Sequence, residues 1–391
     1  MEKLHFPMVH FPLFLLQILP LLLLSSAQTL PTKYFMNCGS KSNITVGGRN
    51  FVGDLNSGSF SVGTSSDVND TNYSATGTSL YQTARIFTLP SQYEFDIIDH
   101  GIYYVRLHFF PFRSGKINLA EALFDVSTSN FSLLSNFGVK ENSTSPVIEE
   151  FLLTINGSKF NIHFAPHKKS LAFVSAIEVF LIPDKDFVRG DFPLVTPAGS
   201  NQTYVSVGSQ VLRTIHRVNV GGPQNNDSLW RTWIPDDDYL LSPGSAKICV
   251  PYNGTLKYDV LGATNYSASD VVYRTCKELA SISSVITWRF DVSKSGSRHM
   301  LRLHFCDIVS TRAAVVKFDA SIYSNFSQKI YLDDSFNKVV QLSAPFYFDF
   351  VVDSDDSGAI SVSIAPRQDS KNKNAYLNGL EILEFSKELM N

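Results

Sequence analysis

The chain has 391 residues and a formal net charge of -3, and only 18% of its residues are charged. A balance this close to neutral gives no electrostatic footprint for DNA or RNA, so we exclude a nucleic-acid partner. Four cysteines are too few to build the fold from disulfide bonds, which leaves the hydrophobic core to hold it together.

The N-terminal segment, residues 1–27, has the organisation of a secretory signal peptide. A short basic start is followed by an apolar run and by Ser25 and Ala27 at the minus-three and minus-one positions of a cleavage site. The alternative is a membrane anchor, but Gln17 and Pro20 interrupt the run, which falls short of the ~20 apolar residues that a span needs. Because no later stretch approaches that length, we expect no membrane span in this chain and a secreted or cell-surface location.

The glycosylation pattern Asn-x-Ser/Thr recurs along the rest of the chain. Repetition of this pattern behind a signal peptide predicts an extracellular glycoprotein. Asn69 and Asn72 are too close together for both to be used. The predicted sites are Asn43, Asn69, Asn72, Asn130, Asn142, Asn156, Asn201, Asn226, Asn253, Asn265 and Asn325.

Short aromatic or β-branched runs, separated by Gly, Ser, Asn and Asp, predict β-strands throughout the sequence, which contains 30 Phe and 16 Tyr. Few stretches show the period of 3.6 residues that marks an amphipathic helix. The fold class that follows is all-β. The clearest predicted strands are residues 102–109, 151–155, 160–164, 285–292, 299–305, 346–352 and 360–364.

Several segments occur twice in the same order. Residues 81–85 (YQTAR) and 106–109 (RLHF) return as residues 273–277 (YRTCK) and 302–305 (RLHF). Shorter echoes relate residues 37–39 to 219–221, 160–166 to 360–366 and 176–180 to 379–383. Ordered repetition of this kind indicates two tandem copies of one domain.

Each copy is predicted to be a two-sheet β-sandwich of the jelly-roll type with the RLHF strand at its centre. Apolar side chains alternate with Arg106 and His108 in the first copy and with Arg302 and His304 in the second, which places these polar residues on the outer face. The recurring histidines are interpreted as structural and not as metal ligands.

The predicted domain organisation follows from the repeat. A first domain covers residues 30–185, a linker rich in Pro, Gly, Ser and Asn covers residues 186–212, and a second domain covers residues 213–386. Residues 387–391 form a C-terminal tail. The disulfide candidates are Cys38, Cys249, Cys276 and Cys306, which allow three pairings among which the sequence does not choose.

The sequence carries no clear motif for catalysis or metal binding. Asp236, Asp237 and Asp238 could supply carboxylates for glycoside hydrolysis, but adjacent aspartates after a proline are typical of a solvated loop. Residues 353–358 imitate the start of a calcium loop, but Ile364 takes the place of the glutamate at its twelfth position. We therefore expect no enzyme activity, no catalytic residue, no metal and no cofactor.

Resemblance to a known family of binding domains implies candidate ligand contacts in the loops that follow the two RLHF strands. Phe110, Phe112 and Arg113 lie after the strand of the first copy, and Asp307 lies after that of the second. The two phenylalanines could instead close the end of the sandwich.

A second group of candidates is Trp230, Arg231 and Trp233, the densest aromatic and cationic cluster of the second copy. Tryptophan and arginine dominate binding hot spots. The same residues could equally hold the two domains together, and we favour this interdomain role.

The motifs as a set resemble those of a known family. Residues 34–40 (YFMNCGS), 47–54 (GGRNFVGD), 81–87 (YQTARIF) and 105–109 (VRLHF) resemble the first malectin-like domain of plant FERONIA/THESEUS-type receptor-like kinases, the Catharanthus roseus receptor-like kinase family. Residues 216–222, 229–233, 302–307 and 377–382 resemble the second. The resemblance covers about residues 34–386 and implies two malectin-like β-sandwich domains in a cell-surface receptor.

The resemblance also implies partners. These are a secreted cysteine-rich signalling peptide of the rapid-alkalinization type together with a lipid-anchored co-receptor, or pectin or another acidic cell-wall polysaccharide. The expected surfaces are the cleft between the domains and the loops after the RLHF strands. Members of the family continue into a membrane-spanning helix and a kinase, and this chain reaches Asn391 with neither, so we expect an isolated ectodomain without kinase activity.

The alternative function is that of a malectin-type lectin, which binds a neutral oligosaccharide through aromatic rings and an acidic residue. The resemblance places one of these aromatic positions on Ile86 in the first copy and near Glu278 in the second. It places the acidic residue in residues 167–170, which contain no carboxylate. We therefore expect that this sugar site is not intact.

Overall fold

The computed structural model describes residues 33–55, 61–62, 64–70, 79–140, 145–188, 190–199, 203–294, 296–312, 315–330 and 341–389. The predicted signal peptide and the predicted glycosylation sites Asn72, Asn142 and Asn201 lie outside them. Strands dominate the described residues, so the all-β prediction is confirmed. The remaining elements there are α2 (Asp270–Arg274) and the 3-10 turns η1 (Ser79–Tyr81), η2 (Leu119–Glu121), η3 (Asp237–Tyr239) and η4 (Pro243–Ser245).

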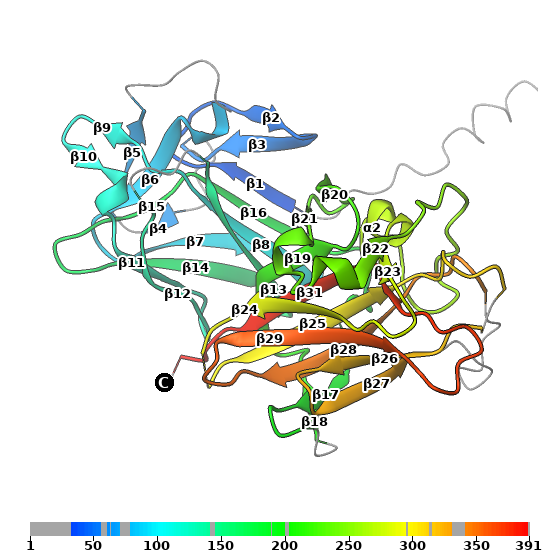
Figure 1. Ribbon diagram of the computed structural model, residues 1–391. Helices are drawn as coiled ribbons and strands as arrows, with labels where there is room; N and C mark the ends of the chain where they lie inside the picture. Colours follow the sequence, from blue (N-terminus) through cyan, green and yellow to red (C-terminus); the bar gives the residue numbers. More distant parts are fainter. Residues whose placement is uncertain are drawn as a thin grey trace, which may run out of the picture. The chain divides into compact units, whose positions relative to one another are not determined.

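In the first half of the molecule, residues 33–188, the RLHF strand is central as predicted. This strand, β8 (Gly101–Phe109), pairs on one side with β13 (Val147–Ile155) and on the other with β16 (Ala176–Leu181) (Figure 1). The same sheet continues through β1 (Lys33–Asn37), β3 (Arg49–Gly53) and β2 (Ile44–Val46). Every residue of β8 after Gly101 is buried, because apolar material covers both faces of the strand.

The described residues of the first half also form two smaller sheets and one two-stranded hairpin. One runs β12 (Ser132–Phe137), β11 (Phe124–Ser127), β14 (Lys159–Pro166), β7 (Ser91–Asp96) and β4 (Ser61–Val62). The other runs β15 (Ala172–Val174), β6 (Thr83–Phe87) and β5 (Ser65–Asn69), and β9 (Arg113–Ser114) pairs with β10 (Ile117–Asn118). Aromatic rings from these strands and from β8 form one core, in which Phe87 stacks on Phe164 at 5.2 Å.

The second half, residues 190–389, repeats this plan. The strand β25 (Arg298–Phe305) lies between β28 (Phe346–Asp353) and β31 (Gly379–Phe385), and β31 pairs with β19 (Val211–Asn219). A second sheet runs β24 (Ile286–Asp291), β29 (Ala359–Pro366), β26 (Phe318–Ile322) and β27 (Phe326–Ile330). Shorter pieces are β20 (Asn225–Asn226) with β21 (Thr232–Pro235), and β22 (Ala246–Ile248), β23 (Lys277–Leu279) and β30 (Tyr376–Leu377).

The central sheets of the two halves join edge to edge. The start of β19 pairs antiparallel with β13, with Leu212 opposite Leu152, so one sheet runs through both halves. Residues 32–391 accordingly form one compact unit. The predicted linker contains β17 (Asp191–Val195), which pairs with β28, and β18 (Tyr204–Ser206), which pairs with β17. In the predicted tail, Lys387 accepts a backbone hydrogen bond from Ser132 of the first half.

A second apolar cluster covers the polar face of this shared sheet. Its members come from both halves and include Phe35, Tyr104, Phe180, Leu229, Met300 and Leu383. The prediction that Arg106, His108, Arg302 and His304 lie on an outer face is therefore wrong, because each is at most 3% exposed. The alternation within one strand separates two faces, but it does not show that a second layer covers the polar one.

In each half a buried aspartate fastens a loop to the core. Asp54 accepts hydrogen bonds from the Gly39 amide at 2.8 Å, the Tyr93 hydroxyl at 2.6 Å and Nε of Arg85 at 3.0 Å. A side chain at Gly39 would collide with the backbone of Ala84, and its φ of +73° also favours glycine.

Asp236 holds the equivalent place in the second half. It accepts hydrogen bonds from the Gly221 amide at 2.9 Å and from Nε1 of Trp288 at 2.7 Å, and it pairs with Lys277 at 3.0 Å. Asp236 is 1% exposed, so the expectation of a solvated aspartate loop is wrong at this position. The carboxylate is stable there because three donors replace its water.

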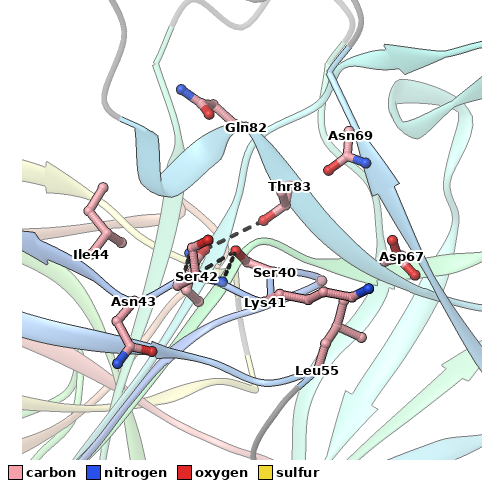
Figure 2. A pocket seen from close by; sticks show the side chains of 12 residues that line it. Ser40, Lys41, Ser42, Asn43, Ile44, Leu55, Asp67, Asn69, Gln82 and Thr83 are labelled. Atoms are coloured by element: carbon pink, nitrogen blue, oxygen red, sulfur yellow. Dashed lines mark hydrogen bonds between the residues drawn. The ribbon is translucent and has the colours of Figure 1, made fainter.

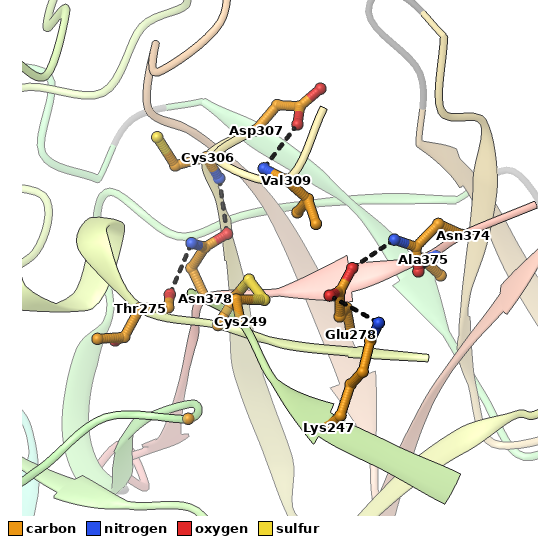
Figure 3. Close-up of a disulfide and its surroundings, with 12 residues drawn as sticks. Lys247, Cys249, Thr275, Glu278, Cys306, Asp307, Val309, Asn374, Ala375 and Asn378 are labelled. Atoms are coloured by element: carbon orange, nitrogen blue, oxygen red, sulfur yellow. Dashed lines mark hydrogen bonds and ion pairs between the residues drawn. A yellow bond between two sulfur atoms is a disulfide. The ribbon is translucent and has the colours of Figure 1, made fainter. Parts of the chain in front are cut away.

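The cysteines of the second half form one disulfide, Cys249–Cys276, with the Cα atoms 5.2 Å apart (Figure 3). It ties the residue after β22 to the residue before β23. The other two candidates, Cys38 and Cys306, are buried thiols. Beside the disulfide, Asn378 donates to the Thr275 carbonyl at 2.8 Å and accepts from the Cys306 amide at 2.7 Å (Figure 3).

Candidate functional site

A hydrogen-bonded chain of three side chains stands on the polar face of β8. The hydroxyl of Tyr81 in η1 lies 2.9 Å from Nδ1 of His108 in β8, and Nε2 of His108 lies 2.9 Å from Oε1 of Glu178 in β16. A neutral imidazole satisfies both contacts when Nε2 donates to the carboxylate and Nδ1 accepts from the hydroxyl. The three residues meet because β8 and β16 are neighbours and η1 lies over them.

Arg106, two residues before His108, links this chain to the second half. Its Nε donates to Glu150 at 2.6 Å, its Nη1 to Glu178 at 3.2 Å and its Nη2 to the carbonyl of Leu229 at 2.8 Å. Burial alone would raise the pKa of both glutamates. The guanidinium of Arg106, joined at Glu150 by that of Arg217, outweighs burial and lowers each pKa to about 2.

Arg217 in β19 extends the network across the junction. It contacts Glu150 of the first half and donates from Nε to Glu381 of the second half at 2.7 Å. Glu150 also accepts from the Thr214 hydroxyl at 2.9 Å. Burial would raise the pKa of Glu381, but Arg217 and the hydrogen bond from His304 lower it. Because every buried charge here has an opposite partner, removal of one would leave the others uncompensated.

The segment between β20 and β21 packs against the first half. The ring of Trp230 meets those of Phe35 and Phe180 edge-on, with centroids 5.7 and 5.6 Å away. The Arg231 guanidinium lies 5.1 Å from the ring of Phe187. These contacts support the interdomain role that we favoured for this cluster.

Asp227 fixes the same segment internally. It pairs with Nε of Arg231 at 2.5 Å and accepts from Nε1 of Trp233 at 2.9 Å. Arg231 is 1% exposed and Trp233 is 0% exposed, so a ligand reaches neither unless the halves separate. Their assignment as ligand contacts stays a prediction.

A cavity of about 600 Å³ opens between the halves on this polar face. The first half contributes Arg49, Tyr81, Arg106, His108, Glu150 and Glu178 among others, and the second half contributes Thr214, His216, Arg217, Asn226, Trp230 and Thr232. Three arginines face two glutamates in this lining, and Glu381, just outside it, pairs with Arg217 and balances the third charge. Sites at the junction of two domains are favoured for ligands, and this cavity combines charge with aromatic surface.

Arg49 is the most available of the three arginines. Its side chain is 16% exposed, whereas those of Arg106 and Arg217 are 3% and 6% exposed. Its Nη1 donates to Glu178 at 2.7 Å, and the guanidinium lies between the rings of Phe51 and Trp230 at 5.5 and 5.6 Å. Its Nε is buried and has no hydrogen-bond partner among the described residues.

The second half repeats the hydrogen-bonded chain, but its three residues are buried and do not line the cavity. Tyr273 lies 2.9 Å from Nδ1 of His304, whose Nε2 lies 3.3 Å from Glu381. The ring of Trp233 stands edge-on to His304 at 5.3 Å. Burial lowers the pKa of His304 and keeps it neutral.

The four candidates that follow the RLHF strands do not line the cavity. Phe112 is 7% exposed and belongs to the core of the first half, and Phe110 is half-buried against Tyr81. Arg113 begins β9 and is exposed. Asp307 is buried, which raises its pKa, and it accepts from the Ser310 amide at 2.9 Å.

Among the residues that line the cavity, sequence reasoning names only Trp230 as a candidate ligand contact. Arg49 and Tyr81 lie within the quoted family motifs, and this position is the signal that could have singled them out. Asn226 was predicted only as a glycosylation site. Nothing local in the sequence indicates that Arg49 and Arg217 face one cavity, because they come from different halves.

Figure 2 shows a second cavity, of about 610 Å³, beside residues 40–43. Its described lining is polar, with Lys41, Asp67 and Gln82, and contains no aromatic residue. Asn43 and Asn69, both predicted glycosylation sites, stand on either side of it (Figure 2). We regard it as the weaker candidate, because it lacks a ring platform.

The fold thus defines a protein of two tandem β-sandwich domains that enclose a charged cavity at their junction. The sequence matches the family described as Malectin-like domain over residues 36–385. The chain belongs to this malectin-like family. Among the described residues, no helix is both long and apolar enough to cross a membrane.

Similar proteins are plant receptor-like kinases. The probable receptor-like protein kinase At5g24010 of Arabidopsis thaliana is 37% identical over 397 residues, which cover 96% of this chain and 47% of that protein. THESEUS 1 of the same plant is 31% identical over 370 residues, which cover 92% of this chain and 42% of that protein. The chain therefore spans less than half the length of these relatives. Because the chain belongs to the malectin-like family and resembles receptor-like kinases, we place it outside the cell or at the cell surface.

Solved structures support the same family. A chain in the crystal structure of the plant peptide RALF23 in complex with FER and LLG2 has a TM-score of 0.74 and 26% identity, and the match covers 92% of this chain and 96% of that chain. The resemblance to FERONIA/THESEUS-type proteins is thus confirmed, as is the pair of malectin-like domains.

Proposed function

We propose that this chain is the extracellular ligand-recognition part of a plant receptor-like protein. Its ligand in this proposal is a secreted cysteine-rich peptide of the rapid-alkalinization type, recognised together with a lipid-anchored co-receptor. The observation that carries the proposal is the match over 92% of the chain to a structure that holds RALF23, FER and LLG2.

The protonation states of two glutamates and a tyrosine in the cavity suit binding better than catalysis. A general acid or base works best with a pKa near the operating pH. Here Glu150 and Glu178 have pKa values of about 2, and burial raises the pKa of Tyr81 to about 12. Because these pKa values lie far from neutral pH, each group stays in one protonation state, which suits a fixed binding surface.

The test is binding of the purified chain to a peptide of this class, with and without a co-receptor of the LLG type. We expect a ternary complex that co-elutes in size-exclusion chromatography and has a measurable affinity by biolayer interferometry. The same peptide, reduced and alkylated, is the matched control because it keeps the sequence and loses the disulfide-bonded shape. No complex with any member of a peptide panel, under conditions where FER binds RALF23, would refute the proposal.

An acidic cell-wall polysaccharide such as pectin is a second candidate, favoured by one specific observation. The guanidinium of Arg49 lies in the cavity wall, and 16% of its side chain is exposed. An exposed guanidinium suits a carboxylate, and the rings of Tyr81 and Trp230 suit the apolar face of a sugar.

Oligogalacturonides and a neutral disaccharide separate this candidate from the lectin alternative. We expect the acidic sugars to bind and Arg49→Gln to weaken them, with Arg113→Gln, an exposed arginine outside the cavity, as the control. Tight binding of the neutral disaccharide alone would favour a malectin-type lectin.

A further inference from the structure

Asn226, the last residue of β20, is a solvent-exposed residue in the wall of the interdomain cavity. Its Oδ1 accepts a hydrogen bond from the Thr232 hydroxyl at 2.9 Å. Its amide nitrogen Nδ2, the atom to which an N-linked glycan is joined, forms no hydrogen bond with another described residue. Residues 226–228 read Asn-Asp-Ser, an acceptor sequence.

The segment that carries Asn226 is held rigidly. Asp227 accepts hydrogen bonds from the amides of Leu229 at 2.9 Å and Arg231 at 3.0 Å, besides its contacts with the side chains of Arg231 and Trp233. Trp230 keeps a φ of 58°, a left-handed conformation that a non-glycine residue adopts only when its surroundings enforce it. A glycan attached to such a base stays near the cavity instead of swinging away with a flexible loop.

We propose that Asn226 carries an N-linked glycan that covers the opening of the interdomain cavity and limits which molecules can enter it. A glycan is bulky and hydrophilic, and its first sugars would stand directly beside Trp230 and Thr232 in the cavity wall. The glycan excludes large polymers and admits a narrow segment, such as one side chain or one sugar unit. This inference rests on the proposed use of the cavity for ligand binding.

Occupancy is the first measurement. Peptide mapping by mass spectrometry of the protein secreted from plant cells should find a glycan on the peptide that contains Asn226. Asn226→Gln removes the acceptor, and Ser228→Ala removes the acceptor sequence while it keeps the hydrogen bond between Asn226 and Thr232. Asn253→Gln is the matched control, because Asn253 is an exposed acceptor of the same half that does not line the cavity.

Quenching of tryptophan fluorescence measures how accessible the cavity is to a small molecule, and it needs no ligand. The chain has three tryptophans, and Trp233 and Trp288 are both 0% exposed, so a quencher in solution reaches Trp230 first. We expect acrylamide to quench Asn226→Gln and Ser228→Ala more strongly than the wild type, and Asn253→Gln to the same extent as the wild type. Binding of oligogalacturonides should strengthen in the first two variants alone.

Two results would overturn the inference. One is an unmodified Asn226 in the secreted protein. The other is equal quenching of the wild type and of the two variants that lack the acceptor at Asn226. If the variants are not secreted, peptide N-glycosidase can remove glycans from the folded wild-type protein; this treatment also acts at the other acceptor sites and leaves aspartate at each one, so Asn253→Gln treated in the same way is measured beside it. Because quenching needs no ligand, a failure of the peptide or polysaccharide proposal leaves this result readable.

Discussion

Replacement of Glu150 by Gln should weaken the junction of the two halves by a measurable amount. Glu150 is 8% exposed and is shared by Arg106 of the first half and Arg217 of the second. The shift of its pKa from 4.5 to about 2 corresponds to roughly 3 kcal/mol in favour of the charged form. This agrees with the ~3–5 kcal/mol that removal of one partner from a buried ion pair costs.

Urea unfolding followed by circular dichroism measures this loss. Glu94→Gln is the control, because Glu94 pairs with Lys159 at the surface, where the two side chains are 31% and 55% exposed. Surface pairs of this kind contribute ~0–1 kcal/mol. The reasoning is refuted if Glu150→Gln lowers the free energy of unfolding no more than Glu94→Gln does.

Three further predictions follow from the same contacts. The pKa of Glu150 is lowered in the folded state, so its contribution to stability is complete above its ordinary value of 4.5 and is lost as the pH falls through about 2. Urea unfolding at several pH values should therefore show a smaller loss of stability in this window for Glu150→Gln than for the wild type. Phe112→Ala and Leu107→Ala should each cost ~2–5 kcal/mol in urea unfolding, because both side chains belong to one core, and a stable Phe112→Ala protein that has lost peptide binding would restore the ligand role of this loop. Cys38 and Cys306 should not react with a thiol reagent in the native protein, because burial raises the pKa of each, and both should react in urea; prompt reaction without urea would contradict their burial.

The sequence predicts the fold well because its signals are local. The alternation of apolar and polar residues in the sequences of β8 and β25 marks them as strands, and the repeated RLHF motif shows that two such strands exist. The glycosylation prediction stays untested, but every acceptor asparagine that the structure describes is exposed, as a glycan requires.

The site is harder to predict because it depends on contacts between distant residues. Glu150 and Arg217 meet only when β19 pairs with β13, and no local pattern reveals that pairing. The same holds for Asp236, which is buried because Trp288 and Lys277 come to it from other strands. Sequence patterns separate apolar from polar residues, but they do not show which polar residues will find partners inside.

The two copies use one arginine in two ways. At the spacing that relates Asp54 to Asp236, Arg49 corresponds to Arg231. Arg231 is buried with Asp227 as an added partner, which satisfies its charge and commits it to the junction. Arg49 has no such partner, keeps 16% of its side chain exposed and faces the cavity.

The two copies of this arginine therefore have different roles, since one holds the junction together and the other lines the cavity. In the second half, Trp233 stands at the position of Phe51, and its larger ring lies closer to His304 than Phe51 lies to His108, at 5.3 against 6.4 Å. The second half contributes the buried Arg231, which fixes the junction. The first half contributes Arg49, whose guanidinium is partly exposed in the cavity. The cavity that we propose as the binding site exists only in the joined molecule, because its wall includes Trp230 and Arg217 of the second half. Separated halves should therefore lose the site even where each one still folds.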